Sequence, residues 1–262
     1  MLPLHLISGG FAMAATLVFA LPREYQTVAW VLLAVSFVGI ATLGCVSLKS
    51  RILGPCVTLG PEKGNRVALT YDDGPDVVGT PEILDLLEDR GVTANFFCIG
   101  KHAAAHPDLV RRMHAAGHLV GNHSQTHTPR LTFTTVGGLR ADLMACQDTL
   151  AEITGERPAY FRPPYGLRSH ATHPAATSAG MQVIGWSTGG GDLSTTPADD
   201  VSARITSELT AGSIILLHDR GPTADKAVEI TRVVLDALQA RRLKPVRLDE
   251  LLADADGKSS QG

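Results

Sequence analysis

Two long apolar stretches open the chain. Neither Met1 to Pro22 nor Tyr25 to Leu48 contains an Asp, Glu, Lys or Arg residue. A helix that spans a bilayer needs roughly 20 mostly apolar residues, and both stretches reach that length. The pattern therefore predicts a transmembrane helical hairpin over residues 1–48. The alternatives are a buried hairpin of a soluble protein and, for the first stretch, a signal peptide, although its start lacks the usual positive charge.

The rest of the chain alternates between two patterns. Residues 49–65 contain glycines and prolines without clear periodicity, which indicates a linker. Beyond it, short apolar runs predict strands at 67–70, 94–98, 119–120, 181–184 and 213–217, and amphipathic stretches predict helices at 81–89, 107–116, 136–153, 197–209 and 225–240. This alternation implies parallel strands joined by crossover helices. We expect one α/β domain over 66–262, either an open sheet or a small barrel, with functional residues at the carboxyl ends of strands.

Charged residues are concentrated in this second part. The chain has 23 Lys and Arg against 26 Asp and Glu, and 44% of its residues are hydrophobic. The absence of a positive excess argues against a nucleic-acid partner, and the apolar content excludes a disordered chain. Four cysteines lie far apart without a CxxC pair, which indicates free structural thiols.

Basic residues near the apolar stretches predict the orientation in a bacterial-type cell membrane. Lys49, Arg51, Lys63 and Arg66 follow the second stretch, whereas the segment between the two stretches has only Arg23. Cytoplasmic loops carry more Lys and Arg, so the count favours a cytoplasmic domain.

Two adjacent carboxylates follow the first predicted strand, in Asp72-Asp73-Gly74-Pro75. Adjacent residues of an extended chain point in opposite directions, so the two acids suit different tasks, such as metal binding and general base catalysis. The alternative is an ordinary Asp-Gly turn.

Histidines occur three times with HxxxH spacing, so spacing alone does not select a metal site. The pairs are His102 with His106, His114 with His118, and His123 with His127. The third pair follows the carboxyl end of a predicted strand, where a helical turn would direct both imidazoles at one ion. We therefore predict His123 and His127 as metal ligands.

Two further candidates follow later strands. His218 comes directly after the strand at 213–217, where an imidazole suits a general acid, although a lone histidine there is often structural. In Arg162-Pro163-Pro164-Tyr165-Gly166, two prolines stiffen a loop whose backbone N–H groups can face a reacting oxygen.

These motifs, in this order, make the chain resemble the NodB-type polysaccharide deacetylases of carbohydrate esterase family 4 from about Arg66 to Ala253. The first motif has Tyr71 where Phe is usual. The resemblance implies a distorted (β/α) barrel with fewer than eight strands. It also implies that Asp72 is the general base and that Asp73, His123 and His127 bind a divalent metal, usually zinc, at a site that also accepts cobalt, nickel or iron.

The resemblance assigns roles to the later motifs as well. Arg162 would orient the general base, and the Tyr165 backbone N–H, in the loop that Pro163 stiffens, would bind the oxyanion. Leu216 would line the acyl-methyl pocket, and His218 would protonate the leaving amine.

The fourth family motif departs from the usual pattern. The family often has Asp followed by Trp in this region, after a strand with another Trp; here Trp186 lies on that strand and Asp192 is followed by Leu193. We expect Asp192 to tune His218 and Trp186 to lie at the substrate site, with a changed wall of the acyl pocket at Leu193.

Together these residues predict a membrane-anchored, metal-dependent hydrolase that removes N-acetyl or other N-acyl groups from amino sugars of a glycan or glycolipid. The alternatives are a deformylase or deacetylase of a polyprenyl-linked amino sugar, and an O-deacetylase. A catalytically inactive, membrane-tethered glycan-binding module is a further alternative, but it would not need both an acid and a base.

Overall fold

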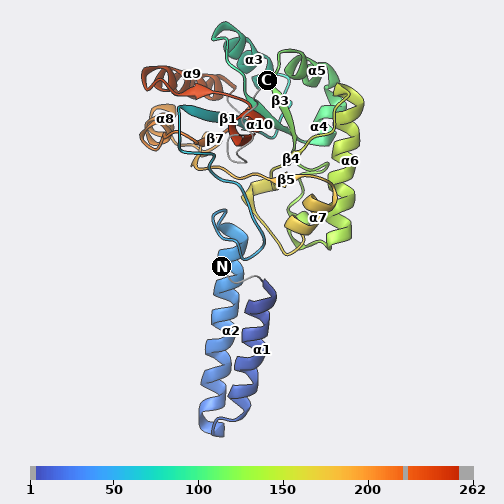
Figure 1. Ribbon diagram of the computed structural model, residues 1–262, viewed down its shortest axis with the longest axis vertical. Coiled ribbons are helices and arrows are strands. Elements are labelled where there is room, and N and C mark those ends of the chain that lie inside the picture. The colour runs from blue at the N-terminus through green and yellow to red at the C-terminus, as the bar shows by residue number, and fades with distance from the viewer. Residues whose placement is uncertain (1–3, 221–223, 254–262) are drawn as a thin grey trace.

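Two N-terminal helices project from an α/β domain in the computed structural model, which describes residues 4–220 and 224–253 (Figure 1). Helix α1 (Leu4–Phe19) and helix α2 (Arg23–Val46) lie side by side. Edge-to-face contacts join them, with ring centroids 5.1 Å apart for Phe11 and Phe37 and 5.2 Å apart for Phe19 and Trp30. The described parts of the two apolar stretches are thus two helices that pack against each other, here called the hairpin, whereas a transmembrane hairpin stays a prediction.

The two helices differ in their capacity to cross a membrane. Helix α2 has 24 residues, about 36 Å at 1.5 Å per residue, which exceeds the roughly 30 Å hydrocarbon core. By length and composition it can span a membrane, a test that a signal sequence near the N-terminus also meets. The 16 residues of α1 reach only about 24 Å. The prediction that the first stretch, Met1 to Pro22, also spans the membrane therefore stays a prediction. Residues 1–3 of that stretch lie outside the described part.

A curled sheet of parallel strands forms the centre of the domain. Its strands are β1 (Arg66–Asp72), β2 (Asn95–Cys98), β3 (Leu119–Asn122), β4 (Tyr160–Phe161), β5 (Gln182–Val183), β6 (Thr188–Gly189), β7 (Ile214–His218) and β8 (Lys244–Pro245). They follow the order β5-β4-β3-β2-β1-β7-β6, with β8 beside the start of β1. Within the described residues the two edge strands, β5 and β6, do not pair. The predicted α/β fold with a curled parallel sheet is thus confirmed, but the expectation of fewer than eight strands is wrong, because the described residues contain eight, four of which (β4, β5, β6 and β8) have only two residues each.

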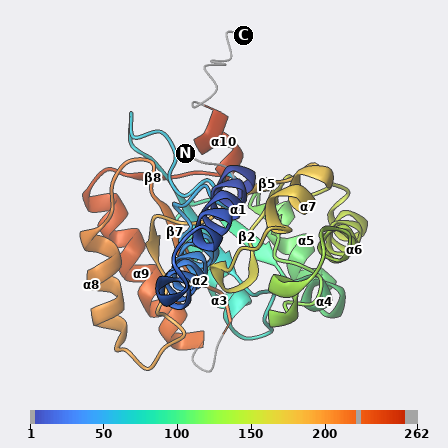
Figure 2. The ribbon, with the colours of Figure 1, turned by 90° about the horizontal axis from the view of Figure 1, so that it is seen from below.

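Helices cover the outer face of this sheet (Figure 2). They are α3 (Gly79–Asp89), α4 (Gly100–Ala105), α5 (Pro107–Ala115), α6 (Val136–Thr154), α7 (Thr172–Ser178), α8 (Ala198–Ser207) and α9 (Ala224–Ala240), and two 3₁₀ turns, η1 (Pro129–Phe133) and η2 (Pro164–Gly166), lie in the connecting loops. Helix α10 (Leu248–Ala253) instead packs Leu248 and Leu251 into the core inside the curled sheet. The five longer helices correspond to the predicted amphipathic stretches. Helices α4, α7 and α10 have only six or seven residues, too few for periodicity to reveal.

The segment before the sheet contacts the domain. Val57 forms an isolated parallel bridge with Ile184, and Leu59 forms an antiparallel one with Ser213. The Val57 backbone N–H donates to Val183, 2.9 Å away. Residues 57–59 are therefore packed on the sheet near the gap between β5 and β6.

The alternation of side chains along β1 explains why Asp72, at the end of this strand, points to the inside of the curled sheet. Val67, Leu69 and Tyr71 belong to the large core that the strands share with the outer helices. Ala68 belongs to the smaller core inside the curled sheet. Because successive side chains of a strand point to opposite faces, Asp72 shares the inner face with Ala68.

Tyr71, the departure from the family's usual Phe, has a partner for its hydroxyl group. The residue is fully buried, and the hydroxyl lies 3.1 Å from the Thr231 hydroxyl of α9. A buried hydroxyl without a partner would destabilise the core, so Thr231 makes tyrosine acceptable at this position.

Arg168 joins the helical hairpin to the domain. Its side chain is 1% exposed, and its guanidinium donates to four backbone carbonyls at and beyond the carboxyl end of α2: Gly44, Ser47, Ser50 and Gly54. The last carbonyls of a helix lack partners within the helix and carry partial negative charge. A buried cation from the domain thus caps the helix that carries the apolar surface.

Replacing Arg168 should loosen this junction. Arg168→Ala removes several charge-assisted hydrogen bonds, each worth about 1.5–3 kcal/mol, and leaves buried carbonyls unpaired. We expect a thermal midpoint lower by at least about 5 °C and faster proteolysis between residues 47 and 55. Arg157→Ala is the matched control, because Arg157 is 58% exposed in its ion pair with Asp148 and should change stability little. Equal effects of both changes would contradict the capping role.

Candidate active site

Asp73, His123 and His127 form a cluster at the carboxyl ends of β1 and β3. Their ligand atoms all lie within 4.8 Å of one another. Asp73 Oδ1 is 3.4 Å from His123 Nε2 and 3.1 Å from His127 Nε2. Burial disfavours the charge of Asp73, but the two histidines outweigh it and hold the pKa of this carboxyl below its usual range. The structure thus brings the three predicted ligands together around an ionised carboxylate.

The separations fit a divalent metal ion. Three donors that each lie about 2.1 Å from one tetrahedral ion are roughly 3.4 Å apart, close to the two distances measured here. The His123 Nδ1 atom lies 2.8 Å from the Arg162 carbonyl oxygen. When Nδ1 donates this hydrogen bond, the Nε2 lone pair faces Asp73, as in many metal-binding histidines. Two imidazoles and one carboxylate also suit several metals besides zinc.

The backbone around the cluster is strained. Asp73, His127 and Tyr165 have φ values of 76°, 49° and 59°, in the left-handed region that favours glycine. Such strain persists only where the surrounding structure imposes it, and it concentrates at functional sites. The unusual backbone is therefore part of how the fold directs these groups at one point.

Arg162 organises the acid next to the cluster. The guanidinium is completely buried, and its Nη1 atom donates to Asp72 Oδ1 and to the Thr70 hydroxyl, both at 2.7 Å. Its Nη2 atom donates to the Gly185 carbonyl at 2.9 Å, and Cζ lies 4.2 Å from the centroid of the Phe97 ring. The free Asp72 Oδ2 atom is 3.9 Å from His123 Nε2. One carboxylate oxygen is thus bound to arginine, and the other faces the cluster.

His218 lies across from this acid, because β7 pairs with β1 in register and places His218 opposite Asp72. Asp192 accepts the His218 backbone N–H at 2.7 Å, and its Oδ1 atom is 3.0 Å from Nδ1. Burial disfavours the imidazolium, but the hydrogen bond and charge of Asp192, with the charges of Asp72 and Asp73, raise the pKa of His218 to about 9. At neutral pH this imidazole is protonated and able to give up a proton.

The Tyr165 loop closes another side of the site. The backbone N–H of Tyr165 has no hydrogen-bond acceptor among the described residues, while the N–H groups of Gly166 and Leu167 bond within the loop. The Tyr165 side chain is 54% exposed, and its hydroxyl donates to the His127 carbonyl at 3.3 Å. The loop is therefore tied to a ligand-bearing segment and keeps one donor available.

The remaining predicted residues support this loop and the site wall. Pro163 is buried at the start of η2. Trp186 is half-buried and packs directly against Gly166, where a side chain would collide with the indole ring. Leu216 is buried in β7 opposite Gly189, two residues before His218.

Several contributors were not predicted. Thr70 positions Arg162, and His102 Nδ1 lies 2.9 Å from the Asp73 carbonyl. Asp142 accepts the Gln125 N–H and the Thr126 hydroxyl, both at 2.8 Å, which holds the loop between the two ligand histidines. Of these, only Thr70 had a usable signal, since it shares the inward face of β1 with Asp72.

Asp219 is a further buried acid beside the first motif. Burial raises the pKa of this carboxyl to about 7, although the Thr80 hydroxyl donates to it at 2.6 Å. Its carboxylate lies where a side chain at position 74 would be, so only glycine fits at Gly74 in the turn after the paired acids.

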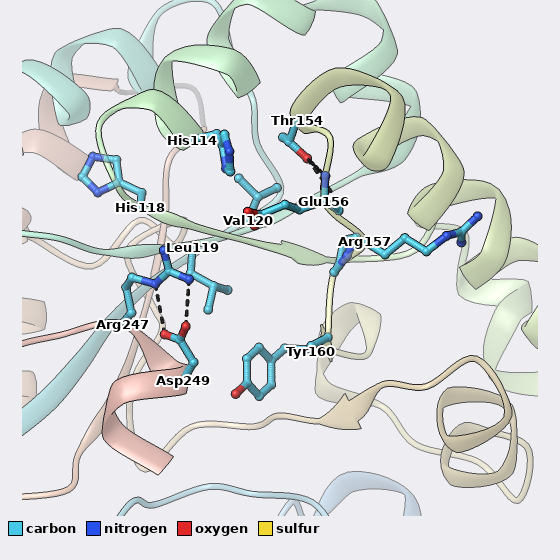
Figure 3. Close-up of a pocket in the computed structure, with 12 residues that line it drawn as sticks. His114, His118, Leu119, Val120, Thr154, Glu156, Arg157, Tyr160, Arg247 and Asp249 are labelled. Carbon is cyan, nitrogen blue, oxygen red and sulfur yellow. Dashed lines mark hydrogen bonds and ion pairs between the residues drawn. The ribbon is translucent and has the colours of Figure 1, made fainter. Parts of the chain in front are cut away.

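The His114 and His118 pair lies at the opposite end of the sheet. There it lines a pocket of about 150 Å³ near the amino ends of β3 and β4 (Figure 3). Burial lowers the pKa of His118 to about 4, and its Nδ1 atom accepts the Ala94 N–H. Arg247 is paired with Asp249 at 2.7 and 3.0 Å. With a neutral imidazole and a paired arginine, this pocket lacks the reactive groups of the other end.

Sequence comparisons point to one family. A model of the polysaccharide deacetylase family matches residues 60–184. A peptidoglycan-N-acetylglucosamine deacetylase from Bacillus cereus is 35% identical over 159 residues, which cover 61% of this chain and 58% of that protein. A chitooligosaccharide deacetylase from a Bradyrhizobium species is 31% identical over 195 residues, covering 70% of this chain and 89% of that protein. The chain thus spans less than two thirds of the Bacillus relative.

Solved structures share the fold. A peptidoglycan N-acetylglucosamine deacetylase in complex with 4-naphthalen-1-yl-N-oxidanyl-benzamide has a TM-score of 0.71 and 29% identity, over 75% of this chain and 92% of that one. A family 4 acetyl xylan esterase from Clostridium thermocellum, in complex with a cobalt ion, has a TM-score of 0.65 and 30% identity, over 71% and 89%.

Metal binding should require the histidines beside Asp73 and should not require the other histidines with HxxxH spacing. His127→Ala removes one of three donors, and we expect its affinity for Zn²⁺ or Co²⁺ to fall by more than the ~10–100-fold typical of losing an outer partner. His114→Ala is the control, since His114 has the same spacing at the opposite end of the sheet. Equilibrium dialysis with elemental analysis measures both; metal retained by His127→Ala would refute the ligand assignment.

Proposed function

Because the chain belongs to the polysaccharide deacetylase family, we propose that it is a metal-dependent hydrolase that removes N-acetyl groups from amino sugars. The observation that carries the proposal is that two hydrogen-bonded side-chain pairs lie beside the Asp73, His123 and His127 cluster. One is Asp72 held by Arg162, and the other is His218 held by Asp192. A proton acceptor and a proton donor across one site are what amide hydrolysis requires.

We assign the proton transfers to these two groups. When bound, a divalent ion supplies Lewis acidity at the amide carbonyl and orients a water molecule. Asp72 accepts the proton of that water as its oxygen bonds to the carbonyl carbon. The Tyr165 N–H donates to the oxygen that becomes negative, a contact whose loss typically costs ~10²–10³-fold in rate. His218 donates its proton to the sugar nitrogen as the C–N bond breaks, which yields the carboxylic acid and the amine. The acid then ionises in solution, and exchange with solvent removes the proton from Asp72 and restores the one on His218.

The same site also bears on the alternatives. A formyl group is smaller than acetyl and would be cleaved by the same proton transfers. An ester oxygen leaves more readily than an amide nitrogen, so O-deacetylation would depend less on the proton of His218. An inactive glycan-binding module is disfavoured, because binding alone gives no reason to bury Arg162 against Asp72 or Asp192 against His218.

We propose that the N-terminal hairpin anchors the enzyme in a cell membrane. The apolar side chains of α2 support this, since many are more than half exposed. The proposed second span is α1, from its apolar composition, and the proposed cytoplasmic side of the catalytic domain rests on the excess of Lys and Arg after α2.

Turnover should require the Asp72 carboxylate. Asp72→Asn keeps the size of the side chain but removes the proton acceptor, so we expect kcat to fall by ~10²–10⁴-fold while metal content stays at the wild-type value. The assay follows acetate and amine released from an N-acetylglucosamine oligomer. Asp85→Asn, at an exposed carboxylate of α3, should leave kcat unchanged. Undiminished turnover in metal-loaded Asp72→Asn would exclude Asp72 as the base.

The pH profile should report the effect of Asp192 on His218. The raised pKa means that His218 is protonated below about pH 9, so kcat should decline as pH rises through that value. Asp192→Asn removes the main cause of the increase, and the decline should move to lower pH. Asp199→Asn, in the exposed first turn of α8, should leave the profile in place. An unshifted profile in Asp192→Asn would show that another group is the acid.

A further inference from the structure

An apolar pocket lies at the junction of the hairpin and the domain, apart from the cluster. It has a volume of about 340 Å³, within the range of small-ligand sites. Its walls come from α1 and α2 through Ile7, Phe37 and Ile40, and from the domain through Phe133 and the segment 168–170. Residues of the hairpin and of the domain thus line one open apolar pocket.

The pocket adjoins the proposed active site through two loops. Phe133 lies six residues after the ligand His127, a separation of at most about 20 Å even in a fully extended chain. Segment 168–170 begins three residues after Tyr165. The Tyr165 hydroxyl bonds the His127 carbonyl, so the two loops are also joined at the site. Chain connectivity therefore keeps the Phe133 rim of the pocket within about 20 Å of His127.

One wall of the pocket is held by hydrogen bonds, and its rim at Phe133 is open to solvent. Arg168 fixes the domain side to the carboxyl end of α2 through four backbone carbonyls. Phe133, in contrast, is 88% exposed although it is aromatic and apolar. A large apolar side chain displayed at the rim of an apolar pocket indicates an interaction surface.

The occupant follows from what surrounds these helices. Phe37 is half-exposed on α2, the helix with the length and composition of a membrane span, so the pocket is continuous with the surface that hydrocarbon would contact. We infer that the pocket holds the hydrocarbon chain of a lipid-linked amino sugar, whose N-acyl group reaches the Asp73, His123 and His127 cluster. This inference rests on the proposed deacetylase function and specifies its substrate class.

Arg130 supplies a positive charge that a phosphate between lipid and sugar would bind. Arg130 lies in η1 between His127 and Phe133, on the path from the cluster to the pocket. Its side chain is exposed, and no carboxylate pairs with its guanidinium in residues 4–220 and 224–253. An unpaired guanidinium suits a phosphate oxygen pair.

The test compares two substrates with the full chain in detergent. The lipid-linked probe is a polyprenyl-phosphate-linked N-acetylglucosamine, and the soluble probe is a chitin tetrasaccharide. We expect wild-type enzyme to prefer the lipid-linked probe. Phe133→Ser should lower the ratio of kcat/KM for the lipid-linked over the soluble probe by roughly tenfold or more, because an aromatic contact with the chain is lost. Leu32→Ser, at a 62% exposed position of α2 outside the pocket, should leave that ratio unchanged.

A second readout does not require activity. A diazirine-bearing polyprenyl phosphate should label peptides that contain Phe133 or Ile40, and excess unlabelled lipid-linked sugar should suppress the labelling. Equal labelling by a diazirine phospholipid, unaffected by that competitor, would show that bulk lipid fills the pocket and would overturn the inference.

The two proposals fail in different ways. No acetate from either probe, with normal competed labelling, would refute the deacetylase function alone. Acetate release with a preference for the soluble probe, or with a ratio unchanged by Phe133→Ser, would refute the lipid-linked substrate alone.

Discussion

A buried guanidinium organises the catalytic end of the sheet. Arg162 bonds Asp72, Thr70 and the Gly185 carbonyl with its side chain, stacks on Phe97, and offers its own carbonyl to His123. It therefore connects strands β1, β2, β3 and the segment after β5. Burying a charge is costly unless it is paired and hydrogen-bonded. The cost is offset here by contacts that each hold a different part of the site. The proposed base contacts the side chain of Arg162 and one proposed metal ligand contacts its backbone carbonyl, so the positions of both depend on the same residue.

A second buried arginine, six residues later, serves the opposite side of the same loop. Arg168 binds the carbonyls at the end of α2, while Arg162 binds the groups around Asp72. Between them lies Tyr165 with its left-handed backbone and available N–H. The loop that carries the proposed oxyanion donor is thus held at one end by the catalytic strands and at the other by the apolar hairpin. Any movement of the hairpin relative to the domain would act on this loop first.

Much of the architecture was predictable because it depends on local pattern. Alternating apolar runs and amphipathic stretches located the five longer helices and the main strands, and the strand-end rule selected Asp72, Asp73, His123, His127 and His218 from many polar residues. The short strands β4, β6 and β8 have two residues each, and such pairs exist only because neighbours in the sheet bond to them. Their formation is a property of the assembled sheet, not of the local sequence.

The sequence by itself determined which residues can do the chemistry and that an apolar segment precedes them, because residue type, spacing and charge are local properties. Tertiary structure decided how the histidine pairs lie relative to Asp73: both His123 and His127 contact its carboxylate, whereas His102 of another pair lies beside its backbone carbonyl, although HxxxH spacing is the same in all three pairs. It also decided the role of Arg168, whose partners are backbone carbonyls and therefore leave no mark in the sequence. The apolar pocket at the hairpin likewise exists only where Phe37 and Phe133, far apart along the chain, are brought to one place by folding.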